Sequence, residues 1–226
     1  MIRLVLFDID GTLVRTHGAG VKAFLSAFDH EFKLPCNGVR LSFAGRTDTS
    51  LVREFFKLHR REPTREDFDR FFDRYVFLLE HNLQHGKGHI IPGVWEWLEQ
   101  LAALPQPPLI GLLTGNVRLG AEIKLRHFNC WERFAIGAFA DDHEDRDQIA
   151  AIAFARGRQL LGPALQPHEV LVIGDTPHDV RCGKSIGARV LAVATGGAKL
   201  PELLASQPDW AVNDLLEIRA ASVIHA

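Results

Sequence analysis

Two aspartates separated by one residue, Asp8 and Asp10, stand at the end of the apolar run that opens the chain. Side chains in a β-strand alternate between faces, so both carboxylates are expected on the same side, where they repel each other. A divalent cation beside them, or a proton held by one of them, relieves that repulsion. The alternative is an Asp-Gly turn that closes a hairpin. The residues after Thr12 do not form the second alternating strand that a hairpin needs, so the pattern favours a chemical site.

A second apolar run of strand length, Leu109 to Leu113, ends in Thr114 and Gly115. A hydroxyl followed by a glycine suits anion binding, because the backbone amide of glycine can approach an anion closely. The structural alternative is that Thr114 caps the next helix. Both interpretations place Thr114 at the end of a strand.

A third run, Glu169 to Ile173, leads through Gly174 into Asp175. Thr176, Pro177 and Asp179 follow, and they fit the capping box of a helix, which could account for Asp179 alone. A cap does not account for Asp175 at the strand tip. The segment therefore indicates a second pair of acidic ligands.

Together these segments resemble three motifs of the haloacid dehalogenase superfamily of phosphohydrolases: Asp8 to Thr12 the first, the strand ending in Thr114 the second, and Asp175 to Asp179 the fourth. The resemblance extends over essentially the whole chain. It implies a metal-dependent phosphohydrolase that works through a covalent aspartyl-phosphate. Dehalogenating relatives lack an acidic residue at the position of Asp10, so phosphoryl chemistry is expected.

The resemblance also implies a role for each acidic residue. Asp8 would attack phosphorus, and Asp10 would protonate the leaving group and then activate water. Asp8, Asp175 and Asp179, with the backbone carbonyl of Asp10, would hold the metal directly or through water. Mg²⁺ is the expected ion, because the ligands are oxygens and phosphate chemistry usually employs it.

The third motif of the superfamily has a lysine at the start of a helix, and here Arg146 stands at that place. Arginine keeps the charge and can hold phosphate through two nitrogens, but it is bulkier than lysine. Thr114, Gly115 and Arg146 are therefore expected to bind the phosphoryl group. The other candidate cation is Lys124, which a straight helix would carry roughly 15 Å from the strand tip.

The elements that must position these residues alternate between helices and short buried strands. Besides the strands already named, the pattern predicts strands at 136–139, 189–193 and 210–212, and helices at 94–101, 117–127, 148–161, 180–186 and from 201. Strands separated by helices of this length indicate a parallel sheet covered on both faces. The expected fold is α/β, a Rossmann-like core formed by residues 1–15 and 90–226.

Residues 16–89 have a different character and are expected to form an inserted α-helical cap domain. Apolar residues recur with helical spacing between Val21 and Gln84, and ten of the 15 phenylalanines lie there. Gly-bearing stretches at 17–20 and 85–89 would act as flexible linkers of a lid. Within the cap, Arg46 precedes a helix and could read the substrate, although Thr47 and Asp48 beside it also fit a simple helix cap.

Composition limits the possible partners. Apolar content is 46%, charged content is 24% and the net charge is −2, as in ordinary globular proteins, and no basic stripe suggests nucleic-acid binding. No apolar run approaches the length that spans a membrane. Cys36, Cys130 and Cys182 are too far apart for a metal or redox pair, which favours a reducing cytoplasm.

Small phosphorylated metabolites are the expected substrates. A phosphatase similar to those acting on phosphoglycolate is the first choice within the superfamily. A sugar phosphomutase with the same helical cap is the second. A regulatory or binding module that has lost activity is a third hypothesis, although the four aspartates of the expected site are all present.

Overall fold

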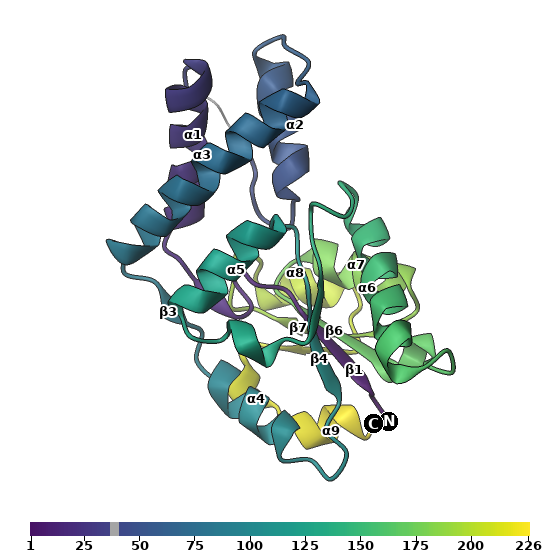
Figure 1. Cartoon of the computed structure of the whole chain (residues 1–226). Coiled ribbons are helices and arrows are strands. Elements are labelled where there is room, and N and C mark those ends of the chain that lie inside the picture. Colours follow the sequence, from purple (N-terminus) through teal and green to yellow (C-terminus); the bar gives the residue numbers. More distant parts are fainter. Residues whose placement is uncertain (37–40) are drawn as a thin grey trace.

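The fold is that of a computed structural model, which describes residues 1–36 and 41–226 (Figure 1). Residues 37–40 fall within the stretch predicted to be helical and lie outside the described residues. A six-stranded sheet has the order β5-β4-β1-β6-β7-β8, and all neighbouring strands are parallel. The strands are β1 (Leu4–Phe7), β4 (Leu109–Leu113), β5 (Ile136–Ala138), β6 (Val170–Gly174), β7 (Arg189–Val193) and β8 (Trp210–Val212). The predicted α/β fold class is confirmed.

The register of the sheet decides where the polar residues meet. Phe7 of β1 is paired with Leu112 of β4 and with Ile173 of β6, so the three strands end at the same level. The chain therefore leaves the sheet at Asp8 beside the segments that carry Thr114 and Asp175. Ligands of such sheets bind at this carboxyl edge.

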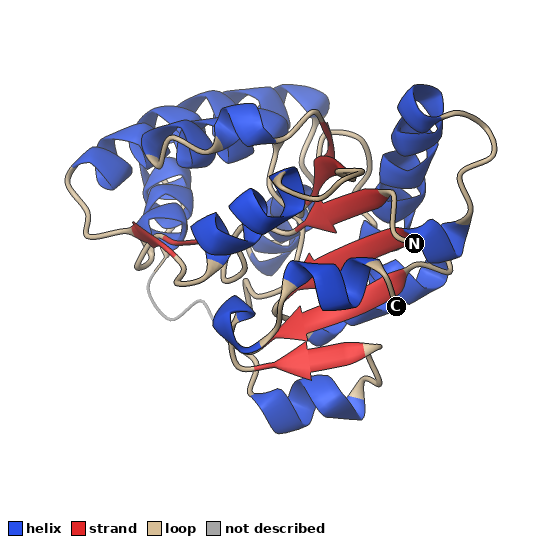
Figure 2. Cartoon of the chain, turned by 90° about the horizontal axis from the view of Figure 1, so that it is seen from below, coloured by secondary structure: helices blue, strands red, loops and turns tan. Residues whose placement is uncertain are grey.

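Alternating side chains bury both faces of the sheet. Val5 and Phe7 pack with one set of helices, and Leu4 and Leu6 pack with the other. Helices α4 (Val94–Ala102), α5 (Arg118–His127) and α9 (Ala220–Ile224) cover the first face, and α6 (Arg146–Leu161), α7 (Pro177–Ser185) and α8 (Leu200–Ala205) cover the second. Figure 2 shows helices on both sides of the strands. Single 3-10 turns lie at Trp131–Arg133, Pro167–Glu169 and Leu215–Glu217.

Three further helices stand together at the end of the molecule opposite the chain termini (Figure 1). They are α1 (Ala19–Phe32), α2 (Asp48–Leu58) and α3 (Arg65–Gln84), and α3 begins with a capping box of Thr64 and Asp67. Aromatic rings fill the space between them, and the ring centroids of Phe28 and Phe55 are 3.9 Å apart. Burial of large aromatic side chains is a main source of packing energy.

A short antiparallel ribbon, β2 (Val14–Arg15) with β3 (His89–Ile90), joins these three helices to the sheet. The linkers predicted at 17–20 and 85–89 are thus shorter than expected, because Ala19 already lies in α1 and His89 lies in β3. Strands of two residues carry no periodic signal, so the sequence could not reveal the ribbon. Among the described residues, no helix is both long enough and apolar enough to cross a membrane.

Candidate active site

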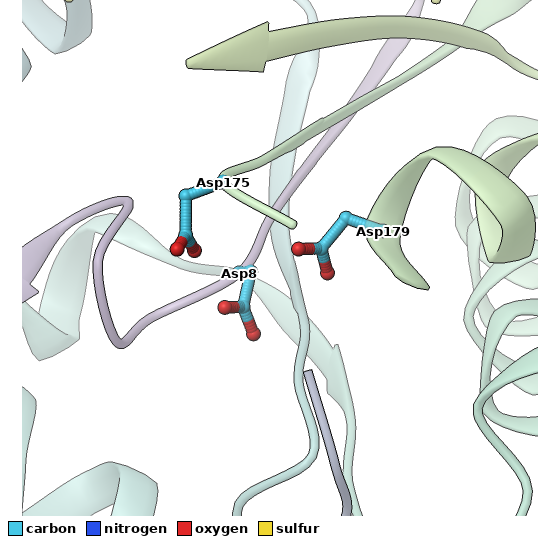
Figure 3. Close-up of side chains that lie close together, drawn as sticks. All are labelled: Asp8, Asp175 and Asp179. Atoms are coloured by element: carbon cyan, nitrogen blue, oxygen red, sulfur yellow. The ribbon is translucent and has the colours of Figure 1, made fainter. Parts of the chain in front are cut away.

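Three buried carboxylates meet at the carboxyl edge of the sheet. Asp8 follows β1, Asp175 follows β6 and Asp179 lies in the first turn of α7, and each offers an oxygen within 4.8 Å of the others. Their exposed fractions are 6%, 2% and 1%. Figure 3 shows the three side chains gathered around a common space. The structure therefore brings together three of the four residues predicted as metal ligands, through their side chains.

The turn after β1 supports this cluster. Gly11 has φ of 88°, and a Cβ on it would lie 2.5 Å from Oδ2 of Asp175, so only glycine fits there. The hydroxyl of Thr12 donates a hydrogen bond to Oδ1 of Asp175 at 3.2 Å. On the other side, the backbone N–H of Gly197 donates to Oδ2 of Asp175 at 3.3 Å. The Gly-Thr pair of the first motif thus positions the carboxylate of the fourth.

Asp179 forms the predicted helix cap and also faces the cluster. Its Oδ2 accepts hydrogen bonds from the backbone N–H of Thr176 at 2.9 Å and from the Thr176 hydroxyl at 2.6 Å, which completes a capping box. Its Oδ1 accepts a hydrogen bond from Arg146. The cap holds the carboxylate in a fixed orientation toward the cluster.

The cluster carries more negative charge than its surroundings offset. Burial, and then the charge of Asp179, raise the pKa of Asp8 from 3.8 to about 7. Burial, and then the charges of Asp179 and Asp8, raise the pKa of Asp175 well above its ordinary value. Oxygen donors held this close, with a deficit of positive charge, suit a divalent cation. The three aspartates can therefore hold a metal ion.

Arg146 is a buried cation at the cluster, with an exposed fraction of 6%. One of its terminal nitrogens contacts Asp179 and lies 3.4 Å from Oδ1 of Asp8. Its Nε is buried, and no described residue accepts a hydrogen bond from it. Its terminal nitrogen Nη1 instead lies beside Gly115, and both residues line the same cavity, so Nη1 is the donor that can reach an anion such as phosphate.

Gly115 lies beside Arg146, and Thr114 precedes it directly after β4. Thr114 is buried, and its hydroxyl oxygen accepts hydrogen bonds from the backbone and side chain of Asn116 at 3.3 and 2.9 Å. A Cβ on Gly115 would lie 3.1 Å from a terminal nitrogen of Arg146 and 2.2 Å from the carbonyl oxygen of Arg46. Position 115 therefore excludes every side chain, which leaves its backbone open to close approach.

Asp10 faces a different cation. Lys124 is 3% exposed, and its Nζ donates hydrogen bonds to Oδ2 of Asp10 at 2.5 Å and to Oδ1 of Asn116 at 2.6 Å. The Nδ2 of Asn116 also donates to Oδ2 of Asp10, at 2.8 Å. The expectation that Lys124 lies far from the site is wrong. Its helix begins only at Arg118, and helical side chains lean toward the N-terminus, so the long lysine side chain reaches back.

Sequence reasoning assigned no role to Asn116 and placed Lys124 too far away. A signal for Lys124 was present, because it shares the buried face of α5 with Gly120, Ala121 and Leu125. A lysine on the apolar face of a helix is rarely fully buried unless it is paired. That pattern was sufficient to predict that the Lys124 side chain points inward to a partner.

A cavity of about 400 Å³ lies between the three helices and the edge of the sheet, and both Asp8 and Asp10 line it. Arg46 also lines it, but its guanidinium pairs with Glu54 at 2.6 Å. Asp48, the first residue of α2, is bonded to the loop that follows β4. Its N–H donates to the carbonyl of Gly115 at 2.7 Å, and its Oδ2 accepts from the N–H of Val117 at 2.9 Å. The helical segment is thus bonded directly to the second-motif loop.

Known proteins resemble this chain in sequence and in fold. The chain matches the family described as haloacid dehalogenase-like hydrolase over residues 5–193. It is 27% identical to the phosphoglycolate phosphatase of Chromobacterium violaceum and 25% identical to the pyrophosphatase PpaX of Bacillus mycoides, in each case over 96% of this chain and 95% of the relative. The crystal structure of CbbY from Rhodobacter sphaeroides in complex with phosphate covers all of both chains, with 17% identity and a TM-score of 0.80.

Proposed function

This chain belongs to the haloacid dehalogenase-like hydrolase family, and on that premise we propose that it is a magnesium-dependent phosphatase of small phosphate monoesters. The observation that carries the proposal is the cluster of Asp8, Asp175 and Asp179 with the guanidinium of Arg146 beside it. Three carboxylates suit a divalent cation, and a guanidinium that lines the cavity suits a phosphate oxygen. The names of the curated relatives, a phosphoglycolate phosphatase and a pyrophosphatase, support phosphoryl transfer as the chemistry.

Asp8 is the nucleophile in this proposal. One of its carboxylate oxygens attacks phosphorus and displaces the alcohol of the ester, which leaves an aspartyl-phosphate on Asp8. Burial holds the side chain in one place at the end of β1, which favours attack from a fixed direction. Mg²⁺ bound by Asp8, Asp175, Asp179 and the backbone carbonyl of Asp10 would keep Asp8 ionised and offset charge on the phosphoryl oxygens.

Thr114, Gly115 and Arg146 bind the phosphoryl group. The terminal nitrogen Nη1 of Arg146, which lies beside Gly115, can donate to a phosphate oxygen. The absence of a side chain at Gly115 lets a backbone amide approach a second oxygen. Such fixed donors stabilise the charge that the oxygens carry during transfer.

Asp10 is the acid and base. Its carboxyl group gives a proton to the oxygen of the departing alcohol, and the resulting carboxylate then takes a proton from the water that attacks the aspartyl-phosphate. The second step releases inorganic phosphate and returns Asp8 and Asp10 to their starting states. Asp10 lines the cavity with Asp8, where substrate would enter.

Residues 16–89 are proposed to act as a cap domain over the core formed by 1–15 and 90–226. The cavity between them supports this role, and Arg46 and Asp48 on the cap side are the candidates for reading the substrate. The three cysteines are free thiols, which fits the proposed cytoplasmic location.

A panel of phosphate compounds tests the proposal. Purified protein with Mg²⁺ is incubated with 2-phosphoglycolate, inorganic pyrophosphate, sugar phosphates and p-nitrophenyl phosphate, and released phosphate is measured. We expect release from at least one monoester, lost on chelation of the metal. Interconversion of sugar phosphates without release would show a phosphomutase instead. A complete lack of turnover across the panel would support a binding module.

A further inference from the structure

We propose that Lys124 is a positioning residue that fixes the carboxylate of Asp10 for proton transfer to the leaving group. The inference rests on the proposed function, because it takes Asp10 as the acid and base. The contact that carries it is the 2.5 Å hydrogen bond from Nζ of Lys124 to Oδ2 of Asp10.

Asp10 needs such an anchor more than the other acidic residues of the site. The side chain of Asp10 is 43% exposed, whereas that of Asp8 is 9% exposed and that of Asp179 is 1% exposed. An exposed carboxylate rotates freely unless it is held. Lys124 and Asn116 both donate to Oδ2, so they fix the carboxylate while Oδ1 is left for exchange of a proton with substrate.

The burial of Lys124 argues for a function. An ammonium group with 3% exposure has lost its hydration, and an apolar side chain of similar volume would pack at α5 at a lower cost in free energy. The environment is built around the charge: Asn116 presents its carbonyl oxygen to Nζ, and its amide nitrogen bonds the same oxygen of Asp10. Lysine, Asn116 and Asp10 thus form a closed triangle of hydrogen bonds.

The surroundings of Lys124 connect this triangle to the helical segment. A Cβ built on Gly20 of α1 would lie 3.7 Å from Nζ of Lys124 and 3.7 Å from the hydroxyl of Tyr75 on α3. Both distances are those of ordinary van der Waals contacts, so α1 and α3 lie close against the end of the Lys124 side chain. Through Lys124, Asp10 is therefore held at the junction of the sheet edge, α5 and the helical segment.

Lys124 is distinct from the phosphate anchor. Two of the three donors of its ammonium are used by Asp10 and Asn116, whereas Nη1 of Arg146 lies beside Gly115, the other proposed phosphate-binding residue. Loss of Lys124 should therefore impair proton transfer and leave phosphate binding intact. Loss of Arg146 should do the reverse.

The test compares leaving groups. Departure of an alkoxide from an alkyl phosphate needs a proton from Asp10, whereas p-nitrophenolate leaves without one. The variant is Lys124→Met, and kcat/KM is measured because it reports the steps up to departure of the alcohol. The alkyl substrate is whichever of 2-phosphoglycolate, glycerol 3-phosphate and ribose 5-phosphate the wild type hydrolyses fastest. Lys184→Met, at an exposed lysine on α7, is the matched control.

We expect Lys124→Met to lower kcat/KM about 100-fold for the alkyl phosphate and less than about tenfold for p-nitrophenyl phosphate. Inorganic phosphate, as a competitive inhibitor, should bind within about twofold of its wild-type affinity. In an Asp10→Asn background the substitution should cause no further loss. Lys124→Gln, which keeps a polar side chain, replaces the methionine variant if circular dichroism shows that the latter is unfolded.

Equal losses on both substrates, or a loss of phosphate affinity beyond about tenfold, would overturn the positioning role. The latter result would make Lys124 a phosphate ligand. A wild-type enzyme without phosphatase activity would refute the proposed function itself, and that outcome is separate because it precedes any comparison of variants.

Discussion

Raising the pH from 6 to 8 should tighten Mg²⁺ binding about tenfold. The metal binds the ionised carboxylate, and burial followed by the charge of Asp179 raises the pKa of Asp8 to about 7. About a tenth of Asp8 is then ionised at pH 6 and about nine tenths at pH 8, a ratio worth about 1.3 kcal/mol of binding free energy. The pKa of Asp175 is also raised, so the full effect should be at least this large.

The raised pKa of Asp8 also determines whether the metal-free protein gains or loses stability as pH rises. A carboxyl group whose folded pKa lies above its unfolded value binds more protons in the folded state, so its contribution to stability is lost as pH rises. For Asp8 the window runs from the ordinary value of 3.8 to about 7. The metal-free protein should lose stability across this window, and Mg²⁺ should restore most of it at the upper end.

The assay is a thermal-unfolding titration with MgCl2 at pH 6, 7 and 8 and constant ionic strength, after removal of bound metal with a chelator. The midpoint concentration of Mg²⁺ should fall as pH rises. Asp8→Asn is the matched control, because amide nitrogen and oxygen replace the titrating carboxylate with little change in size. An affinity at pH 6 within about twofold of that at pH 8 would refute the electrostatic reasoning.

Three further predictions concern single substitutions. Asp8→Asn should abolish phosphate release while circular dichroism shows an intact fold; residual turnover near the wild-type rate would remove Asp8 as nucleophile. Arg146→Ala should weaken inhibition by inorganic phosphate about tenfold or more. Arg146→Lys should recover part of the inhibition, because the positive charge returns. Unchanged inhibition in Arg146→Ala would exclude Arg146 as a phosphate ligand. Gly196→Ala should lower the free energy of unfolding, measured by chemical denaturation, by about 1–3 kcal/mol, because its Cβ would lie 1.6 Å from Oδ2 of Asp175. Gly197→Ala is the control and should have a smaller effect, because the nearest atom to its Cβ would be 3.8 Å away. Equal losses of stability in the two variants would contradict the packing argument.

Much of the sheet could be predicted from local pattern. The bounds predicted at Leu109–Leu113, Arg189–Val193 and Trp210–Val212 agree with β4, β7 and β8, because buried parallel strands are short apolar runs that end at polar residues. The ribbon of β2 and β3 could not be predicted, since it depends on pairing between segments far apart in sequence. The short helix α9 was missed as well, because five residues are too few to show helical periodicity.

The same holds for the site: residues tied to a local sequence pattern could be located from the sequence, and those placed by the reach of a side chain could not. Asp8, Asp175 and Asp179 could be located because each follows a recognisable strand or opens a helix, and membership of the haloacid dehalogenase superfamily is confirmed by the family match. Lys124 was misplaced because distance along a helix axis says little about where a flexible side chain ends. Arg146 was chosen from its place in the motif, and its role in phosphate binding remains a prediction.

Trapping of the covalent intermediate tests the central proposal most directly. The enzyme is mixed with its best substrate and Mg²⁺, quenched in acid within one turnover, and treated with borohydride, which reduces an aspartyl-phosphate to homoserine. Tandem mass spectrometry of the amino-terminal peptide then identifies the modified position. The proposed mechanism predicts homoserine at the position of Asp8 and unmodified Asp10. Phosphate release with no modification at Asp8, or with modification at Asp10, would contradict it.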